Sequence, residues 1–211
     1  MDRSNPPYVT EEWGELHGAT IDLVRDAFNS QGVEVTFDAV DGVMAQEIQL
    51  TVGRADAAAD FTITDRRLRW FAFSDRYHIE ELQALTLKHG LIWPGWQHFG
   101  GIVGVKADSY ALEYLIRHHH QVRHLPVDST ERLFAVLGEG RVQAIVLSRI
   151  TGAAFLESGD HDDVVVSGTP FGPAPLALAA LPEQRSVLDI FNAGLAIVGS
   201  EVERLSPFRP H

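Results

Sequence analysis

Apolar positions along the chain alternate between two spacings, every third or fourth residue and every second residue. The first spacing predicts helices and the second predicts strands. Helices are expected over residues 21–31, 44–52, from about 109, 130–137 and 187–198. Strands are expected over residues 33–37, 55–64, 82–87, 102–105, near 122, 142–147, 164–166 and 176–180. This alternation of helix and strand predicts an α/β fold with mostly parallel sheets.

Two loop-rich stretches interrupt the pattern and indicate where the chain changes from one lobe to another. The first, residues 90–101, contains four glycines, one proline and two tryptophans, and the second, residues 168–175, contains two glycines and three prolines. Glycine and proline in such density favour loops over helices or strands. We therefore expect one lobe formed by residues 1–89 and 173–211 and another formed by residues 90–172.

Composition and charge exclude several function classes. The chain has 211 residues, no cysteine and a formal net charge of −12. Disulfides, thiolate metal sites and cysteine nucleophiles are therefore excluded. An acidic surface also disfavours nucleic acid and anionic lipid as partners.

The charge is unevenly distributed, since residues 1–86 carry 7 Lys and Arg against 16 Asp and Glu side chains. Four arginines nevertheless lie together in this acidic part: Arg66, Arg67, Arg69 and Arg76. No window approaches the roughly 20 apolar residues of a membrane helix, so no membrane insertion is expected. Three consecutive histidines at 118–120 cannot face one point on a helix or strand, and we expect a solvated turn there, with no metal and no cofactor.

Several motifs, at matching spacings, carry a family resemblance. They are Leu16-His-Gly-Ala-Thr-Ile-Asp-Leu23, Gly53-Arg-Ala-Asp-Ala57, Thr62-Ile-Thr-Asp-Arg-Arg67 with Phe73-Ser-Asp-Arg-Tyr77, Val103-Gly-Val-Lys-Ala-Asp-Ser109, Gly140-Arg-Val-Gln-Ala-Ile-Val-Leu-Ser148 and Pro6-Pro7-Tyr8. Together they resemble the bacterial extracellular solute-binding proteins of family 3, whose members read G-F-x-x-D-L, G-x-x-D-A, T-I-T-x-x-R, F-S-x-P-Y, V-G-V-x-x-G-T and G-x-x-D-A-V-x-x-D. The resemblance implies a two-lobed, type II periplasmic-binding-protein fold with a double crossover between lobes. The apolar strand that relatives carry before P-P-[FY] is missing here or supplied otherwise.

The resemblance also implies a function, the binding of a small carboxylate-bearing solute (an amino acid or analogue) in an inter-lobe cleft, as the substrate-binding component of an ABC importer. Partners would then be this ligand and the membrane subunits of the transporter. The protein would be periplasmic or extracellular if a leader has been removed, and cytoplasmic if Met1 is the native start.

Site residues follow from the motifs by resemblance. A guanidinium fork replaces the hydration of a ligand carboxylate with two charge-assisted bonds, and the resemblance gives this role to Arg67. A solvated surface arginine, or an ion pair with Asp65 or Asp75, is the alternative. Other expected ligand contacts are Thr62, Asp60, Ser109, Tyr8, Asp108, Tyr110 and Ser148. Capping of a helix is the alternative role for Ser109, and ordinary packing is the alternative for Tyr8.

One departure bears on the ligand. In relatives, the motif G-x-x-D-A-V-x-x-D ends in an aspartate that pairs with the ammonium group of the ligand, whereas here the same position is Ser148. An ammonium group that loses its water without gaining a carboxylate partner costs free energy. We therefore expect a ligand other than a standard α-amino acid unless Asp60 or Asp108 supplies the charge. A dehydratase-type enzyme with Asp60 or Asp108 as general acid, or a sensing module with a degenerate site, are the alternative functions.

Overall fold

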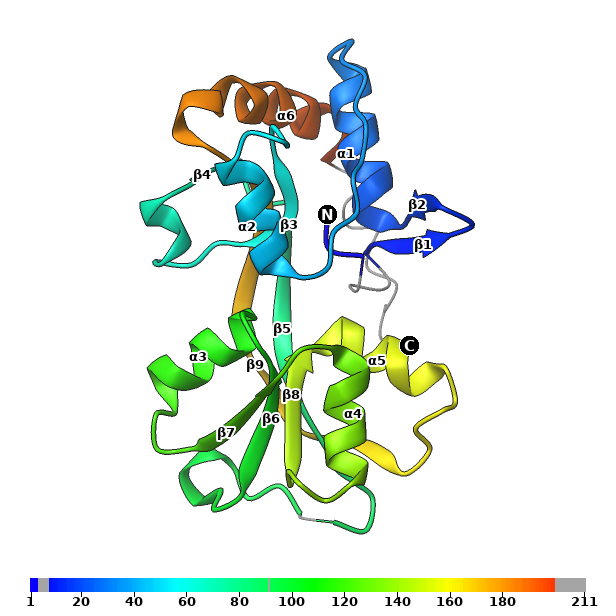
Figure 1. Cartoon of the computed structure of the whole chain (residues 1–211), viewed down its shortest axis with the longest axis vertical. Coiled ribbons are helices and arrows are strands. Elements are labelled where there is room, and N and C mark those ends of the chain that lie inside the picture. The colour runs from blue at the N-terminus through cyan, green and yellow to red at the C-terminus, as the bar shows by residue number, and fades with distance from the viewer. Residues whose placement is uncertain (4–7, 91, 200–211) are drawn as a thin grey trace. The chain divides into compact units, whose positions relative to one another are not determined.

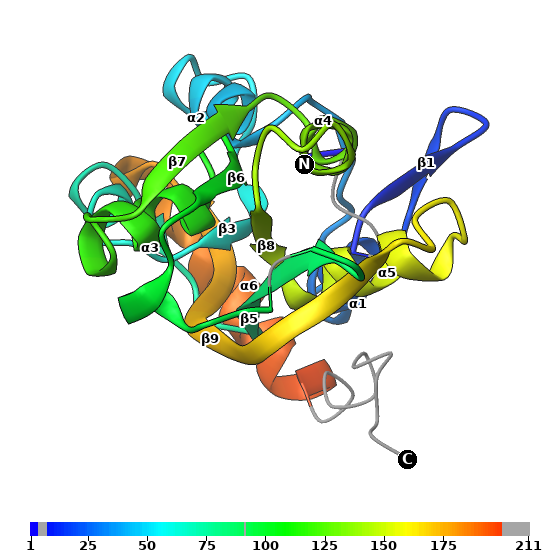
Figure 2. The same cartoon turned by 90° about the horizontal axis from the view of Figure 1, so that it is seen from below.

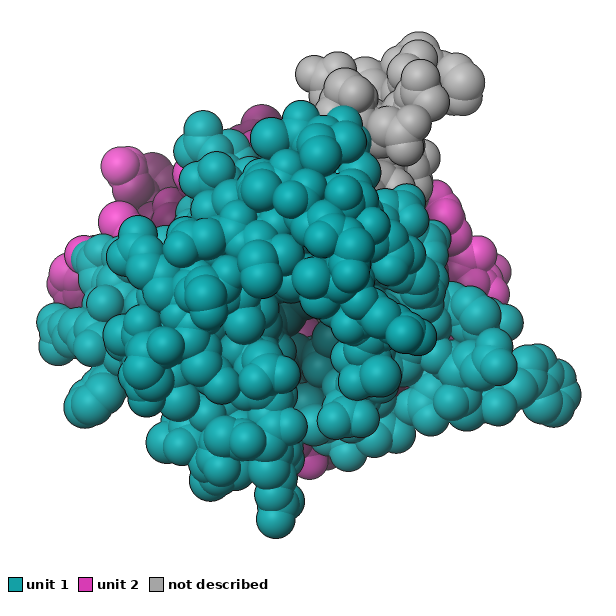
Figure 3. All heavy atoms as spheres, turned by 90° about the horizontal axis from the view of Figure 1, so that it is seen from above, with its two compact units in different colours: residues 1–79, 175–211 teal, residues 80–174 magenta. Residues whose placement is uncertain are grey.

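The chain divides into two compact units, which are described here separately. The computed structural model describes residues 1–3, 8–90 and 92–199. Unit 1 contains residues 1–79 and 175–211, and unit 2 contains residues 80–174 (Figures 1 and 3). Two long strands, β5 (His78–Leu87) and β9 (Val164–Ala180), each begin in one unit and end in the other. An α/β fold built from two units is thus confirmed.

Unit 1 is built around a pair of packed helices, α1 (Ala19–Ser30) and α6 (Arg185–Val198). Phe28 and Phe191 pack across this pair with ring centroids 5.8 Å apart. Gly194 allows the close approach, because a Cβ there would lie 2.0 Å from the carbonyl oxygen of Ala27. The other elements that lie wholly in unit 1 are β1 (Thr10–Glu12), β2 (Glu15–His17), α2 (Val43–Thr51), β3 (Ala58–Thr62), η1 (Arg67–Arg69), β4 (Ala72–Phe73) and η3 (Pro182–Gln184).

The sheet of unit 1 is antiparallel in its named ladders, whereas the sequence predicts mostly parallel pairing. β3 pairs with the last part of β9, Ala58 opposite Ala179 and Thr62 opposite Leu176, and β4 pairs with the same part of β9. β9 enters unit 1 at the second crossing. Its two neighbours in the sheet there, β3 and β4, both run in the opposite direction, so both pairings are antiparallel.

Unit 2 is a sheet covered by helices on both faces. Its elements are η2 (Trp96–His98), β6 (Ile102–Lys106), α3 (Tyr110–His118), β7 (Arg123–Val127), α4 (Thr130–Gly138), β8 (Ala144–Ser148) and α5 (Arg149–Glu157). β6 lies parallel to both β7 and β8, and β5 pairs antiparallel to β8 (Figure 2). Alternate residues of β8 enter two different cores, Ala144 and Val146 in one, Ile145 and Leu147 in the other. A strand buried on both faces explains the continuous apolar run at residues 144–147.

The crossings between units differ from the predicted positions. The chain changes unit at 79/80 and 174/175, inside β5 and β9, where the sequence predicts 89/90 and 172/173. The loop-rich stretch 90–101 lies wholly within unit 2, where Trp93 and Trp96 pack together with centroids 4.8 Å apart. A stretch rich in glycine and proline can thus hold a half-buried pair of tryptophans within one unit instead of linking two units.

Three further predictions about elements were wrong. Residues 168–175, predicted as a loop, continue β9 as one strand of 17 residues. Helix α5, which directly follows β8, was not predicted. Residues 33–37, predicted as a strand, are extended but form no ladder in the described structure.

Candidate functional site

Two serines cap helices at one edge of the unit 2 sheet. Because β6 and β8 are parallel neighbours, their carboxyl ends lie at the same edge, and each leads into a helix. Ser109 Oγ caps α3 by accepting from Leu112 N at 3.3 Å, and it donates to the Lys106 carbonyl at 2.6 Å. Ser148 Oγ caps α5 by accepting from Thr151 N at 3.2 Å. The edge of the sheet thus gathers two helix N-termini, which favour anionic groups.

Glu80 places a carboxylate beside Ser148. The Ser148 hydroxyl donates to Glu80 Oε1, and Glu80 is only 9% exposed. The contact arises because β5 pairs with β8, Leu82 opposite Ser148, which puts the first residue of unit 2 next to the end of β8. The carboxyl group that the sequence lacks at position 148 is therefore supplied in space by a residue of a different strand.

The two other predicted residues of this edge take separate roles. Asp108 is exposed and adopts a left-handed backbone conformation, φ 56°, in the turn between β6 and α3. Tyr110 OH donates to the Pro173 carbonyl of β9 at 2.9 Å. Burial raises the pKa of Tyr110, so the phenol keeps its proton and remains a donor.

In unit 1, Arg67 is held inside the protein by its own unit. The residue is 1% exposed, its Nη1 donates to the Thr62 carbonyl at 2.9 Å, and its Nε donates to Glu47 Oε1 at 3.3 Å. The guanidinium also lies 4.6 Å from the centroid of the Phe61 ring. Burial alone would raise the pKa of Glu47, but hydrogen bonds and charges from Arg66 and Arg67 outweigh burial and lower it. Arg67 is thus hydrogen-bonded to the backbone of Thr62, and it forms an ion pair with Glu47, which the sequence analysis did not predict.

Asp60 forms a second buried polar group in unit 1. Its Oδ1 accepts hydrogen bonds from Thr20 Oγ1 at 2.7 Å and Tyr77 OH at 3.0 Å, while its Oδ2 is buried without a hydrogen-bond partner. Its backbone is left-handed, φ 55°, a conformation that aspartate tolerates better than most residues. Burial raises the pKa of the Asp60 carboxyl from 3.8 to about 6, although the hydrogen bonds from Thr20 and Tyr77 lower it. The group therefore changes charge close to neutral pH.

Tyr8 is buried in unit 1 beside His78, with ring centroids 5.7 Å apart. Pro6 and Pro7, the other residues of that motif, lie outside the described residues. His78 and Tyr77 directly precede the crossing at 79/80, and Glu80 directly follows it. Three polar side chains, those of Tyr77, His78 and Glu80, therefore lie next to this crossing in the sequence.

Motif positions give eight of these side chains as predicted ligand contacts, whereas sequence reasoning gave no site role to Glu80, Glu47 or the pair Thr20 and Tyr77. The Glu80-Glu81 pair before an apolar strand is the only sequence signal for Glu80, and it does not say which strand pairs with it. Among the described residues, no cluster of three or more His, Asp or Glu side chains is placed to hold a metal ion. Nor does any helix of the described chain have the length and apolar content needed to span a membrane.

Each unit has its own charged and polar groups. In unit 2, two helix N-termini favour an anion, whereas the carboxyl group of Glu80 favours a cation. In unit 1, Arg67 favours a carboxylate and the carboxyl group of Asp60 favours an ammonium group.

Comparison with known proteins shows the family to which the chain belongs. Residues 1–201 match the family of bacterial extracellular solute-binding proteins, family 3. The L-cystine-binding protein TcyJ of Escherichia coli strain K12 is 26% identical over 202 residues, which cover 93% of this chain and 74% of that protein.

Solved structures share the fold. An ancestral arginine-binding protein bound to glutamine superposes with a TM-score of 0.84 at 23% identity, over 97% of this chain and 92% of that one. A histidine kinase sensor domain with similarity to periplasmic binding proteins superposes with a TM-score of 0.88 at 19% identity, over 97% and 91%. The match to the family over nearly the whole chain identifies this protein as a member of the bacterial extracellular solute-binding proteins, family 3.

Proposed function

We propose that the protein binds an amino acid or a close analogue, as the substrate-binding component of an ABC importer outside the cytoplasmic membrane. Named ligands of its relatives support this class of solute, since one relative is an L-cystine-binding protein and another was solved with glutamine. Both ligands carry a carboxylate and an ammonium group on the same carbon. The membrane subunits of the transporter would be its protein partners.

The observation that carries the proposal is the buried contact between Ser148 and Glu80. With a serine at the position where relatives have an aspartate, the sequence leaves the ligand ammonium without a partner. Glu80 supplies a carboxylate at that place, largely withdrawn from water. A charge-assisted bond from an ammonium to this carboxylate compensates for the water that both groups lose. A standard α-amino acid is therefore included in the proposed ligand class.

For the carboxylate of the ligand, the contacts proposed in unit 2 are Ser109 and the N-terminus of α3. The contacts proposed in unit 1 are Thr62 and Arg67. The N–H groups at the N-terminus of a helix can bind an anion without the help of a charged side chain. The guanidinium of Arg67 carries a permanent positive charge, which also favours a carboxylate. Because Glu47 and the Thr62 carbonyl hold Arg67 in place, its orientation does not need to be established by the ligand. Further ligand contacts are proposed at Asp60 and Tyr8 in unit 1, and at Asp108 and Tyr110 in unit 2.

A ligand screen tests the proposal. Thermal unfolding of the intact chain is measured with each standard amino acid, with cystine and with matched carboxylic acids that lack the amine. We expect the unfolding midpoint to rise with one or more amino acids, because a ligand that binds only the folded state stabilises it. Absence of any shift across the panel contradicts the proposal.

Adjacent residues give a matched pair of variants for the ammonium contact. Glu80→Gln removes the buried charge, while Glu81→Gln removes an exposed charge that pairs with Arg149 at 3.6 Å. Glu80→Gln is expected to weaken binding of the amino acid at least about tenfold, since the bond to a charged group is lost. Glu81→Gln is expected to leave affinity unchanged, and equal affinities in all three proteins would refute the role of Glu80.

A second pair tests the arginine. Arg67→Lys keeps the charge but loses the planar fork, whereas Arg66→Lys changes an exposed residue with the same partner, Glu47. We expect weaker ligand binding only in Arg67→Lys. The relatives do not favour the dehydratase alternative. If the protein were such an enzyme, the ligand added in these binding measurements would be consumed.

A further inference from the structure

The hairpin of β1 and β2 carries a fully exposed tryptophan at its tip. Trp13 and Gly14 form the turn that joins the two strands, and both have left-handed backbone conformations, φ 57° and 82°. Hairpin turns of this kind favour Asn, Asp or Gly, and a bulky side chain at such a position is strained. The Trp13 side chain gains no packing in return, because it is fully exposed. Figures 1 and 2 both show the hairpin projecting from unit 1 on the side away from α2.

Two glutamates beside this turn create a second local conflict. Glu12 and Glu15 lie directly opposite each other in the β1–β2 ladder, so both side chains leave the same face of the hairpin. Both are exposed, and like charges placed opposite each other destabilise a strand pair. His17 Nε2 lies 3.9 Å from Glu15 Oε2, whereas Glu12 has no ion pair among the described residues. Such a tip is suited to a partner that offers both apolar and positively charged groups.

Unit 1 also carries an exposed apolar patch. Helix α2 buries Gln46 and Leu50, and three large apolar side chains, at intervals of four residues, lie on the opposite face of the helix and its C-terminal cap. Glu47 connects α2 to the segment of η1 through an ion pair with Arg66 at 2.5 Å, and that segment exposes two more large apolar side chains. The α2 patch consists of five side chains, each more than half exposed: Met44, Ile48, Val52, Leu68 and Trp70.

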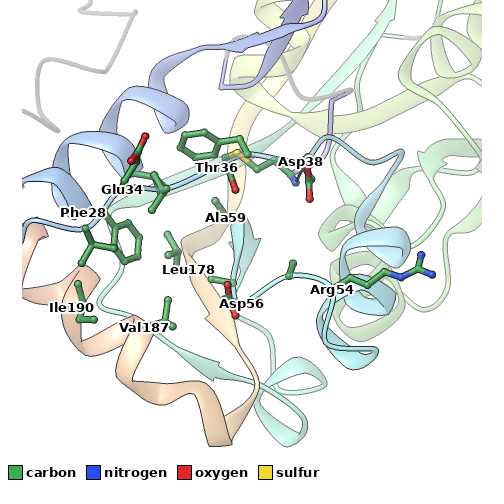
Figure 4. Close-up of a pocket in the computed structure, with 17 residues that line it drawn as sticks. Phe28, Glu34, Thr36, Asp38, Arg54, Asp56, Ala59, Leu178, Val187 and Ile190 are labelled. Carbon is green, nitrogen blue, oxygen red and sulfur yellow. Dashed lines mark hydrogen bonds between the residues drawn. The ribbon is translucent and has the colours of Figure 1, made fainter.

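Two exposed arginines border the α2 patch within an otherwise acidic part of the chain. Arg69 lies between Leu68 and Trp70 in the sequence, and Arg54 follows the end of α2. In the part of the chain that the structure describes, neither guanidinium forms an ion pair or a hydrogen bond. Figure 4 shows the Arg54 side chain pointing away from the cavity of unit 1. Tryptophan, methionine and arginine are also the residues enriched where proteins contact one another.

The α2 patch suits the hairpin tip better than the cavity of unit 1 does. That cavity has a volume of about 310 Å³, and Glu34, Asp38 and Asp56 supply negative charge around it (Figure 4). The glutamates of the tip would be repelled there, whereas the arginines beside the α2 patch attract them. Since the hairpin projects on the side away from α2, it cannot reach the patch of its own chain (Figures 1 and 2).

We propose that the hairpin tip of one copy of this chain docks on the α2 patch of a second copy, so that the chains associate head to tail. Trp13 would cover the apolar side chains of the patch, and the two glutamates would form ion pairs with Arg54 and Arg69. Because the contact uses two different surfaces of each copy, it leads to rings or open chains. One hairpin tip buries less than the roughly 1,200 Å² of stable interfaces, so the association is weak. This inference does not depend on ligand binding.

Charge reversal on each side of the contact tests the proposal. A hairpin variant carries Glu12→Arg with Glu15→Arg, and a patch variant carries Arg54→Glu with Arg69→Glu. Sedimentation velocity gives the weight-average mass of each protein, and of an equimolar mixture of the two variants, as the concentration is raised about a hundredfold. The series is measured at low and at high salt, since salt screens exposed ion pairs.

A matched control reverses two exposed carboxylates that belong to neither surface. Asp26→Arg with Asp189→Arg changes residues on α1 and α6, and it alters the net charge by the same amount as the hairpin variant. In wild type and in this control, the mass is expected to rise at least about 1.5-fold at low salt and much less at high salt.

Each charge-reversed variant is expected to remain a monomer by itself, because groups of like charge then meet. The equimolar mixture is expected to associate again, since every hairpin meets a patch of opposite charge. A wild type that stays monomeric at every concentration overturns the proposal. A mixture that does not associate overturns it as well.

Two further measurements separate the tryptophan and the membrane. Trp13→Asn is expected to stay monomeric with an unfolding midpoint at least as high as that of wild type, because asparagine tolerates the left-handed turn. Association of Trp13→Asn equal to that of wild type overturns the role of the hairpin tip. Binding of monomeric wild type to phosphatidylglycerol vesicles, lost only in the patch variant, also overturns the proposal, because the patch would then bind an anionic membrane.

Discussion

Replacing Asp60 by asparagine removes the charge of one buried carboxyl group while keeping its shape. Asparagine retains an oxygen that can accept the hydrogen bonds from Thr20 Oγ1 at 2.7 Å and Tyr77 OH at 3.0 Å. It also tolerates the left-handed backbone conformation, φ 55°, that Asp60 adopts. The variant therefore isolates the free energy of charging this group within the folded unit.

The magnitude follows from the pKa. Burial raises the pKa of Asp60 from 3.8 to about 6, so the folded protein binds a proton more tightly than the unfolded chain does. Because the folded-state pKa lies above the unfolded one, this group contributes a stability loss as pH rises through the interval between them. Integrated from about pH 4 to about pH 7, the loss amounts to about 2 kcal/mol.

The assay is urea unfolding of wild type and Asp60→Asn at a series of pH values across this interval. Other titrating groups are common to both proteins, so their contributions cancel in the difference. We expect the stability of the variant relative to wild type to increase by about 2 kcal/mol between about pH 4 and about pH 7. A difference that stays constant with pH would refute the assignment of a raised pKa to Asp60.

Two further substitutions test the packing of unit 1 and the polar edge of unit 2. Gly194→Ala is expected to destabilise the protein by about 3 kcal/mol, since its Cβ would lie 2.0 Å from the Ala27 carbonyl oxygen and force α1 and α6 apart. Ser148→Ala is expected to cost about 2 kcal/mol, because it removes both the cap of α5 and the hydrogen bond donated to the Glu80 carboxylate. Urea unfolding measures both.

Each of these substitutions has a control in the same chain. Gly138→Ala places a Cβ at the end of α4 with no atom within 4 Å, and it should leave stability nearly unchanged. Ser109→Ala removes a comparable cap together with a hydrogen bond donated to the neutral Lys106 carbonyl instead of to a carboxylate, and it should cost only about 1 kcal/mol. Equal losses at Gly194 and Gly138 would contradict the helix contact, and equal losses at Ser148 and Ser109 would contradict the contact with Glu80.

The sequence predicts most helices and the buried strands of unit 2 because their signals are local. The apolar run at 144–147 is continuous since both faces of β8 are buried, and Ser109 and Ser129 mark the starts of α3 and α4 by side-chain caps. Strand β9 was divided in two because glycine and proline at 168–175 lower strand propensity. Tertiary pairing overrides this propensity and keeps the strand continuous.

The polar site depends on long-range pairing, which a single sequence does not contain. The sequence shows only a neutral serine at position 148. The pairing of β5 with β8 brings Glu80, 68 positions away in the chain, into hydrogen-bond contact with it. Asp60 likewise meets Thr20, 40 positions away in the chain. Motif resemblance finds the position of Arg67, but its partner Glu47 follows only from how α2 packs near the end of β3.

The central claim, that this protein binds an amino acid, is tested most directly by titration calorimetry of the intact chain near neutral pH. Cystine, arginine and glutamine are titrated in turn, with an amine-free dicarboxylic acid as reference. We predict saturable binding of one solute per chain for at least one amino acid and none for the reference. No binding heat from any amino acid, at temperatures chosen so that the enthalpy is not zero, would contradict the account.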